Sequence, residues 1–104
     1  MSNIIPITIR ISDELKEKLS LVTKRYGFTR TNFLRIGIFD YLVDKKYPFN
    51  PCELKETSKE HRLVLNVNQI AYDSIKQASL DYDISVNSVI ISIAYHMIDK
   101  FSKE

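Results

Sequence analysis

The sequence predicts a mainly helical α+β fold in which two tandem strand–helix–helix units form a pseudo-two-fold pair. The pair would share one two-stranded antiparallel ribbon and contain four main helices. Three observations predict this fold. Residues 6–11 alternate between apolar and polar side chains, as in a half-buried strand. Leu15 and Leu19 then repeat at helical spacing. The whole pattern returns after a shift of 56 residues, without a gap.

The composition fits one compact domain and excludes several classes of protein. The chain has 104 residues, of which 44% are hydrophobic and 27% charged, as is ordinary for a globular domain. No apolar run approaches the roughly 18 residues of a membrane span, and the first residues do not resemble a secretory signal. The single cysteine, Cys52, and the distant His61 and His96 do not form a metal-ligand set. We therefore expect a cytoplasmic protein without metal, cofactor or membrane association.

The internal repeat defines the organisation of the chain. Residues 7–12 lie over 63–68, Tyr26 lies over Tyr82, and residues 28–31 lie over 84–87. The first unit covers about 6–43 and the second about 62–99, within one domain, 1–104. The linker, about 44–61, is interpreted as a solvated connector, with a short helix beginning near Asn50 as the alternative.

The strand of the first unit needs a partner, because a lone edge strand is unstable. Residues 62–67 supply that partner, and a two-fold relation makes the strands antiparallel. The expected pairs are Thr8 with Val64, Pro6 with Asn66, and Arg10 with Arg62. The opposite face of this ribbon would cover the helices with Ile7, Ile9, Ile11, Leu63, Leu65 and Val67.

The first helix of each unit has a start signal, an apolar stripe and an end signal. Ser12 and Asn68 are expected N-caps, and Gly27 and Asp83 are expected to end the helices in the left-handed conformation. The stripes contain Leu15, Leu19, Val22 and Tyr26 in the first unit, and Ala71, Ile75, Ala78 and Tyr82 in the second.

The second helix of each unit is apolar almost all round, so it must be buried on several sides. It is expected to start near Thr29 or Thr31 in the first unit, and near Ser85 or Asn87 in the second. Its apolar residues are Phe33, Leu34, Ile36, Ile38, Phe39, Tyr41 and Leu42, then Val89, Ile90, Ile91, Ile93, Ala94, Met97 and Ile98. Only a second unit could bury so much apolar surface in a chain of this size.

The charge is unevenly distributed. The net charge is +2, but residues 1–52 carry nine Lys/Arg against five Asp/Glu, and residues 53–104 carry six against eight. The first unit is therefore the more suited to a polyanion.

These features resemble the ribbon-helix-helix (Arc/MetJ) family of DNA-binding proteins. The resemblance is carried by the short alternating strand, the capped helix, the turn "YGFTRTNF" at residues 26–33 and the buried second helix. In that family two units make one functional fold, usually as a homodimer. This chain is similar to a tandem, single-chain version, and the resemblance implies double-stranded DNA as its partner.

The resemblance also implies which side chains meet the bases. In that family the ribbon enters the major groove and its outward residues read base edges. Those positions fall here on Thr8, Arg10, Val64 and Asn66, with Pro6 and Arg62 at the ends. Arg can bind guanine and Asn adenine through two hydrogen bonds, while Thr or Val can contact a thymine methyl group. Because the two strands differ, we expect an asymmetric DNA subsite for each chain.

Phosphate contacts are implied at the start of the second helix, where free N–H groups and the helix dipole favour anions. The matching residues are Thr29, Arg30 and Thr31 in the first unit, and Ser85 and Asn87 in the second. Val86 replaces the basic residue of the turn, so the second clamp should be weaker. Lys24 and Arg25 are expected to add non-specific affinity.

Several biological roles remain open. A transcriptional repressor is the commonest role in the family, and an accessory protein bound at a plasmid transfer origin beside a relaxase is the alternative. Partition and antitoxin roles, the latter with a toxin as partner, also occur in the family, as does self-association of chains on adjacent subsites. A role of another class is a protein-interaction module that docks a partner through exposed Tyr47, Phe49 and Phe101.

We expect no enzyme. The sequence has no nucleophile–base–acid pattern and no phosphate-binding glycine loop. His61 and His96 stand apart from any acid or nucleophile in the sequence, and His96 is interpreted as a surface or partly buried structural residue.

Overall fold

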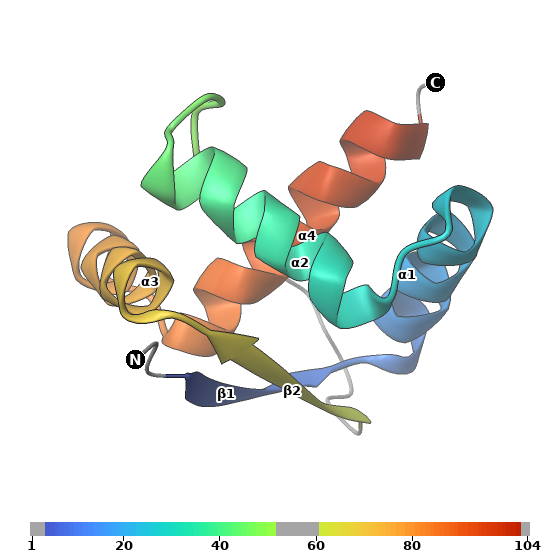
Figure 1. Cartoon of the computed structure of the whole chain (residues 1–104), viewed down its shortest axis with the longest axis horizontal. Coiled ribbons are helices and arrows are strands. Elements are labelled where there is room, and N and C mark those ends of the chain that lie inside the picture. The colour runs from blue at the N-terminus through green and yellow to red at the C-terminus, as the bar shows by residue number, and fades with distance from the viewer. Residues whose placement is uncertain (1–3, 52–60, 103–104) are drawn as a thin grey trace.

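The computed structural model describes residues 4–51 and 61–102, and its elements follow the expected order (Figure 1). Strand β1 (Ile5–Ile11) is followed by helices α1 (Asp13–Tyr26) and α2 (Arg30–Ile38). Strand β2 (His61–Val67) is followed by helices α3 (Gln69–Tyr82) and α4 (Val86–Ser102). Corresponding elements begin 56 residues apart, at 5 and 61, 13 and 69, and 30 and 86. The expected two strands and four main helices are therefore confirmed, whereas Cys52 and most of the linker lie outside the described residues.

The two strands form one antiparallel ribbon with the predicted register. Thr8 pairs with Val64, Pro6 with Asn66, and Arg10 with Arg62. The alternating pattern of the sequence explains the burial along β1, where Ile7, Ile9 and Ile11 are buried and the residues between them are exposed. In β2 the apolar residues Leu65 and Val67 are buried, and Leu63 is half-buried.

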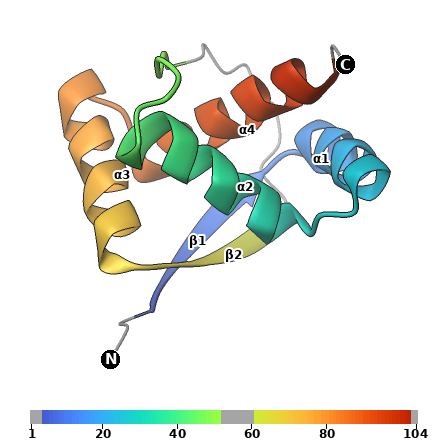
Figure 2. The ribbon, with the colours of Figure 1, turned by 45° about the horizontal axis from the view of Figure 1, so that its top comes forward.

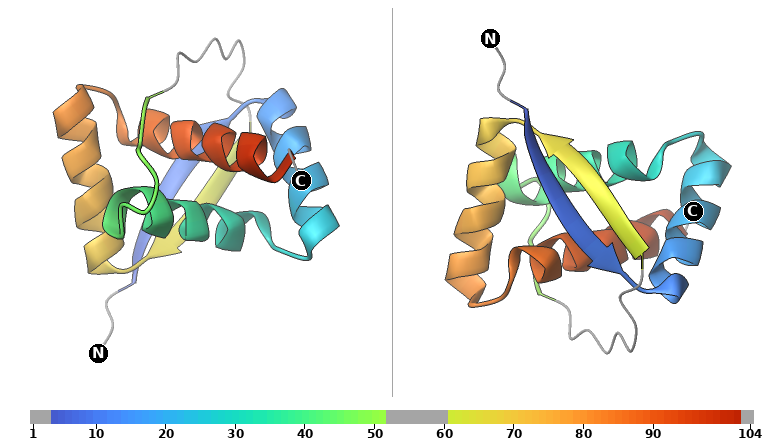
Figure 3. Two further views of the ribbon diagram at one scale, coloured as in Figure 1. Left: turned by 90° about the horizontal axis from the view of Figure 1, so that it is seen from above. Right: turned by 90° about the horizontal axis from the view of Figure 1, so that it is seen from below.

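All four helices lie on one face of the ribbon, and none of the helices in the described part of the chain lies over the other face (Figures 1 and 2). Helices α1 and α3 lie at opposite ends of the molecule, and α2 and α4 run side by side between them (Figure 3). Helix α4 contacts α1, α2, α3 and β1, so it is the centre of the core. This central position explains why α4 is apolar almost all round.

The ends of α1 and α3 are capped as the sequence predicts. The hydroxyl of Ser12 accepts a hydrogen bond from the N–H of Leu15 (3.1 Å), and the amide oxygen of Asn68 accepts one from Ala71 (2.9 Å). Gly27 ends α1 at a φ of 77°, and Asp83 ends α3 at a φ of 53°. A glycine adopts this left-handed conformation without the penalty that a side chain brings.

Helices α2 and α4 approach each other closely at Gly37. A Cβ atom on Gly37 would lie 2.6 Å from Cγ2 of Ile93 and 2.8 Å from Cγ of Met97. Ile93 is fully buried and Met97 is 1% exposed, so neither side chain has free space into which to move. The absence of a side chain at Gly37 therefore allows the two helices to pack at this distance.

Several expectations about the apolar residues are wrong. Ile36 and Phe39 are 37% and 53% exposed, although the all-round apolar pattern predicts burial. After Ile38 the chain continues as a π-helical segment, η1 (Phe39–Val43), which changes the angular spacing of the side chains that follow. Tyr41 and Leu42 are buried as expected.

The apolar stripes predicted for α1 and α3 also differ from the burial that the structure shows near the ends of these helices. Val22 is only half-buried and Tyr82 is 44% exposed. The buried residue near the end of α1 is Thr23, whose hydroxyl donates a hydrogen bond to the carbonyl oxygen of Leu19 (2.8 Å). Its polar group is thereby satisfied inside the helix, so a threonine can occupy the core position.

The described part of the linker is not a solvated connector, which corrects that interpretation. Phe49 is buried, and its carbonyl oxygen accepts a hydrogen bond from the hydroxyl of Tyr82 (3.1 Å). The ring of His96 stacks on Tyr41 and its Nε2 hydrogen-bonds to the carbonyl oxygen of Asn50. Tyr47, Phe49 and Asn50 thus hold this segment against α3 and α4, while residues 44–46, 48, 50 and 51 are exposed. His96 has the partly buried structural role that the sequence suggests.

Phe101, in the last turn of α4, also packs against another element. The hydroxyl of Tyr26 donates to the carbonyl oxygen of Phe101 (3.1 Å), and their rings meet edge to face. Phe101 and Tyr47 are half-buried, and Phe49 is buried. The three aromatic residues named for a protein-docking surface are therefore not the exposed group that this role requires. No helix among residues 4–51 and 61–102 is long and apolar enough to cross a membrane.

Candidate nucleic-acid interface

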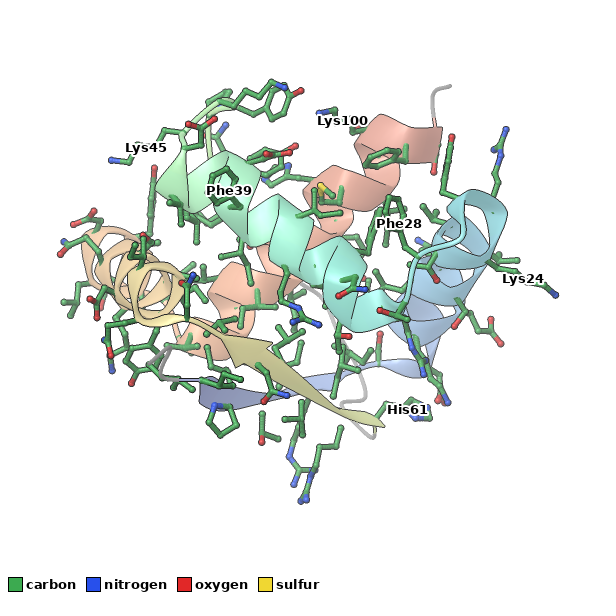
Figure 4. The ribbon with its side chains drawn as sticks, in the orientation of Figure 1. Lys24, Phe28, Phe39, Lys45, His61 and Lys100 are labelled. Carbon is green, nitrogen blue, oxygen red and sulfur yellow. The ribbon has the colours of Figure 1, made fainter. Side chains whose placement is uncertain are left out.

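The outer face of the ribbon presents the side chains that the sequence places there. Pro6, Thr8, Arg10, Arg62, Val64 and Asn66 are all exposed. The side chains below the ribbon project away from the helices (Figure 4). Val64 is 45% exposed, although an apolar residue gains stability from burial. This face is therefore built from alternate positions of two strands and is open along its length.

The cations of this face gather at one end. Arg10 and Arg62 are direct cross-strand partners, at the end of the ribbon from which β1 leads into α1. Neither guanidinium forms a hydrogen bond or an ion pair with any residue in the described ranges. Like charges placed opposite each other on a ribbon are destabilising. The pair therefore creates a local positive potential that an anion or an electronegative base edge would relieve.

The main chain at Arg10 is held by α4. The side-chain amide of Asn87 accepts a hydrogen bond from the N–H of Arg10 (2.7 Å) and donates one to its carbonyl oxygen (3.1 Å). Asn87 was expected to contact phosphate, but its side-chain amide bonds the edge of β1. The equivalent residue in the first unit is Thr31, whose hydroxyl lies 3.3 Å from that of Thr29.

The N-terminus of α2 has the geometry of a capped helix. Thr29 is the N-cap, and its hydroxyl accepts a hydrogen bond from the N–H of Asn32 (3.2 Å). Arg30 is the first helical residue and is half-buried. No acidic residue occupies this first turn, so the positive end of the helix dipole is not neutralised by its own sequence.

The N-terminus of α4 resembles that of α2 in shape but differs in charge. The hydroxyl of Ser85 accepts a hydrogen bond from the N–H of Ser88 (3.0 Å). Val86 stands where α2 has Arg30. Of the predicted phosphate ligands at this end, Ser85 remains exposed and Asn87 is bonded to β1.

Lys24 and Arg25 lie in the last turn of α1 and are both exposed. Lys24 points outward from α1, away from the rest of the molecule (Figure 4). The guanidinium carbon of Arg25 lies 5.6 Å from the centre of the Tyr26 ring. These two cations therefore belong to the side of the molecule and lie apart from the ribbon face.

The sequence pattern alone does not predict one contact at the ribbon end, between a histidine and a carboxylate. Nε2 of His61 contacts the Oδ1 atom of Asp13, so the expectation that His61 has no acid beside it is wrong. The signal was present in the register, since His61 pairs with Ile11 and Asp13 follows two residues later. The contact ties the start of β2 to the start of α1.

Within the described ranges, no group of three His, Cys, Asp or Glu residues could hold a metal ion. Comparisons of the chain with protein-family models, with curated proteins and with solved structures give no match.

Proposed function

We propose that this protein is a sequence-specific double-stranded DNA-binding protein of the ribbon-helix-helix type, and that its ribbon enters the major groove. The observation that carries this proposal is the outer face of the ribbon, where Thr8, Arg10, Val64 and Asn66 are exposed on a surface that none of the described helices covers (Figure 1). Two strands about 4.8 Å apart fit a groove about 12 Å wide.

The chemistry of the face suits base recognition. Arg10 and Arg62 can each donate two hydrogen bonds to O6 and N7 of guanine, and Asn66 can bind N6 and N7 of adenine. Thr8 and Val64, at the centre of the ribbon, can contact thymine methyl groups. The side-chain amide of Asn87 accepts one hydrogen bond from the main chain of Arg10 and donates another to it, which fixes the main chain from which the Arg10 side chain extends.

The tandem arrangement supports the same proposal. Thr8 pairs with Val64, which is the residue 56 positions later and hence its own counterpart in the repeat. A two-fold axis between the strands produces this register, as it does at the centre of a homodimeric ribbon. We infer that the two units form an intramolecular pseudo-dimer, in which each unit takes the place of one protomer of a homodimer.

The positive N-terminus of α2 supplies the second part of the proposal. Arg30, Thr29 and Thr31 surround a helix start without acidic residues, which is a suitable phosphate site. In the second unit, Val86 brings no charge and Asn87 is bonded to β1. The first unit should therefore contribute the stronger backbone contact.

Regulation of transcription is the role that we propose for this DNA binding. Service at a plasmid transfer origin is the second candidate, because the two strands of the ribbon carry different residues and so favour a non-palindromic subsite. An interaction module docking through Phe49 is not proposed, since that side chain is buried.

Selection of binding sites from random duplex DNA tests the proposal. We expect one enriched asymmetric subsite, with affinity that falls steeply as salt rises. Arg10→Ala and Asn66→Ala should each relax the preference at one base pair by about 1–3 kcal/mol. Lys76→Ala, which removes an exposed cation on α3, is the matched control and should leave the preference unchanged. Failure to enrich any sequence, or binding that is insensitive to salt, would refute the proposed function.

A further inference from the structure

A groove lies between α2 with η1 on one side and the end of β2 with the start of α3 on the other. Its volume is about 400 Å³, which falls within the roughly 300–1,000 Å³ of small-molecule sites in proteins. Its wall includes Ile4, Phe39 and Ile70, which are 66%, 53% and 64% exposed. Large apolar side chains gathered at one exposed place are typical of a binding site.

The internal repeat explains why this groove is open. The residues 56 positions away from Ala71 and Arg35, both of which line the groove, are Leu15 and Ile91. Leu15 and Ile91 are fully buried, whereas Ala71 is half-buried and Arg35 is exposed. At the counterpart positions two large apolar side chains therefore fill the core, and the groove has a small side chain and an outward-facing cation in their place.

The rim of the groove also differs from its counterpart. On the surface of α1, Glu14 and Lys18 form an ion pair (3.0 Å), and Nζ of Lys18 lies 5.8 Å from the centre of the Tyr95 ring. The residues 56 positions after this ion pair are Ile70 and Ser74, which cannot form one. An apolar rim thus stands where the other unit carries a charged one, although the two units share one fold.

The groove contains one cation in this apolar setting. Arg35 donates a hydrogen bond from a terminal nitrogen to the side-chain oxygen of Asn32 (2.8 Å), which uses one of the five N–H donors of a guanidinium. No acidic residue of the described ranges forms an ion pair with Arg35. Arg35 can therefore bind a carboxylate through two parallel hydrogen bonds.

We propose that this groove binds a small monocarboxylate with an apolar body, such as a medium-chain fatty acid. Its carboxylate pairs with Arg35, and its chain lies against Phe39 and Ile70. The single cation matches a ligand with one negative charge. A protein partner would need about 800 Å² of surface on each side, which a groove of this volume does not offer.

The site adjoins the proposed DNA-reading face, because Asn66 also lines the groove. A bound carboxylate neutralises Arg35 and places an apolar chain beside Asn66. Bound ligand should therefore weaken the preference at the base pair assigned by Asn66→Ala. This regulatory part rests on the proposed function, whereas the binding of the ligand does not.

Calorimetric titration of the full chain tests the charge requirement without DNA. The probes are octanoate and octan-1-ol, which have the same chain length and differ in charge. Octanoate should bind about tenfold more tightly, because hydrogen bonds to a charged partner are the stronger ones. Arg35→Gln should remove this difference and leave the affinity for octan-1-ol unchanged. Equal affinities for the two probes, or no binding of octanoate at about 1 mM, would overturn the proposal.

Ile70→Glu tests the location of the site. It introduces the acid that the other unit carries at this position, and an acid in the first turn of a helix suits the helix dipole, so the fold is retained. Octanoate affinity should fall by about tenfold or more, because the apolar wall would then carry a like charge. Leu80→Glu is the matched control, since Leu80 is 75% exposed on the same helix and lies outside the groove. Unchanged octanoate binding in Ile70→Glu would overturn the assignment.

Binding-site selection with and without octanoate separates this proposal from the proposed function. A weaker preference at the Asn66 base pair, seen in the natural chain and absent in Ile70→Glu, would support both. Octanoate binding by a chain that selects no DNA sequence would support the groove and refute the proposed function. Selective DNA binding by a chain that does not bind octanoate would do the reverse. An unchanged base preference in the octanoate-bound chain would refute the regulatory part.

Discussion

Asn87 shows how one side chain can link the core to the outer face of the ribbon. Both polar atoms of its amide bond the main chain of Arg10, so α4 and β1 are joined directly beneath an exposed arginine. A residue on a rigid element positions a binding side chain more accurately than a free strand edge would. Asn87 is therefore a positioning residue for Arg10 in the proposed DNA complex.

Replacing Asn87 with alanine should relax base preference more than it reduces total affinity. Two hydrogen bonds are lost, each worth about 0.5–1.5 kcal/mol, and the Arg10 main chain becomes free to shift. Binding-site selection with Asn87→Ala should show a weakened preference only at the base pair assigned by Arg10→Ala. Thr31→Ala, the change at the equivalent position of the first unit, should reduce affinity for all sequences alike. Equal relaxation at every position would argue against positioning.

The pKa values of Tyr47 and Tyr41 are shifted in opposite directions by their surroundings. Hydrogen bonding and the charge of Lys100, whose Nζ lies 3.4 Å from the centre of the Tyr47 ring, lower the pKa of Tyr47. Burial raises the pKa of Tyr41. As pH rises into the alkaline range, Tyr47 should therefore ionise before Tyr41. Ionised Tyr47 favours the folded state, while the stabilisation from neutral Tyr41 is lost as pH rises through its folded-state pKa.

An absorbance titration of phenolate formation checks this order. Lys100→Gln should raise the pKa of Tyr47 toward the ordinary tyrosine value, and Tyr47→Phe should remove the ionisation step that Lys100→Gln shifts. Lys76→Gln serves as a control with no expected effect. A step that still responds to Lys100→Gln in the Tyr47→Phe background would contradict the assignment.

At the level of elements, the crossing of α2 and α4 depends on Gly37. Alanine there should destabilise the fold by about 1–2 kcal/mol, because overpacking against Ile93 and Met97 exceeds the gain in helix propensity. Denaturant unfolding measures this change.

Gly27→Asp is the control, since Asp83 ends α3 in the same left-handed conformation and a Cβ at Gly27 meets no atom within 4 Å. It should cost less than Gly37→Ala. An alanine at Gly37 that leaves stability unchanged would show that the two helices do not approach this closely.

The elements could be predicted from the sequence to different degrees. The alternation of residues 6–11 and the caps Ser12 and Asn68 are local signals, so strands and helix starts agree with expectation. The exposure of Ile36 and Phe39 could not be predicted, because an all-round apolar helix does not reveal which side lacks a partner. The π-helical segment after Ile38 and the packing of Phe49 depend on tertiary contacts that no local pattern encodes.

The candidate site could be predicted where repeat and alternation act together. The 56-residue shift sets the register, and the register places all six outward residues, from Pro6 to Asn66. Asn87 could not be assigned in this way, since an asparagine at a helix start is equally suited to a phosphate or to a neighbouring strand. Predicting the His61–Asp13 contact also requires extending the strand register to its last pair, Ile11 with His61.

At the scale of the whole molecule, the ribbon is completed within one chain. The unfolding temperature should therefore not change between nanomolar and micromolar protein, because folding involves no association step. Thermal unfolding followed over this concentration range checks the expectation. A midpoint that rises with concentration would indicate that a second chain is needed to complete the fold.

The intramolecular pairing of β1 with β2 also determines how many chains are needed to assemble one ribbon. A recognition surface assembled from two separate chains dissolves on dilution, so its host must maintain enough protomers to keep it assembled. Here each newly made polypeptide carries both strands and is complete as soon as it folds. Under the proposed function, a single copy in a cell could therefore occupy its DNA subsite, and the number of assembled ribbons would rise linearly with translation rather than with the square of the chain number.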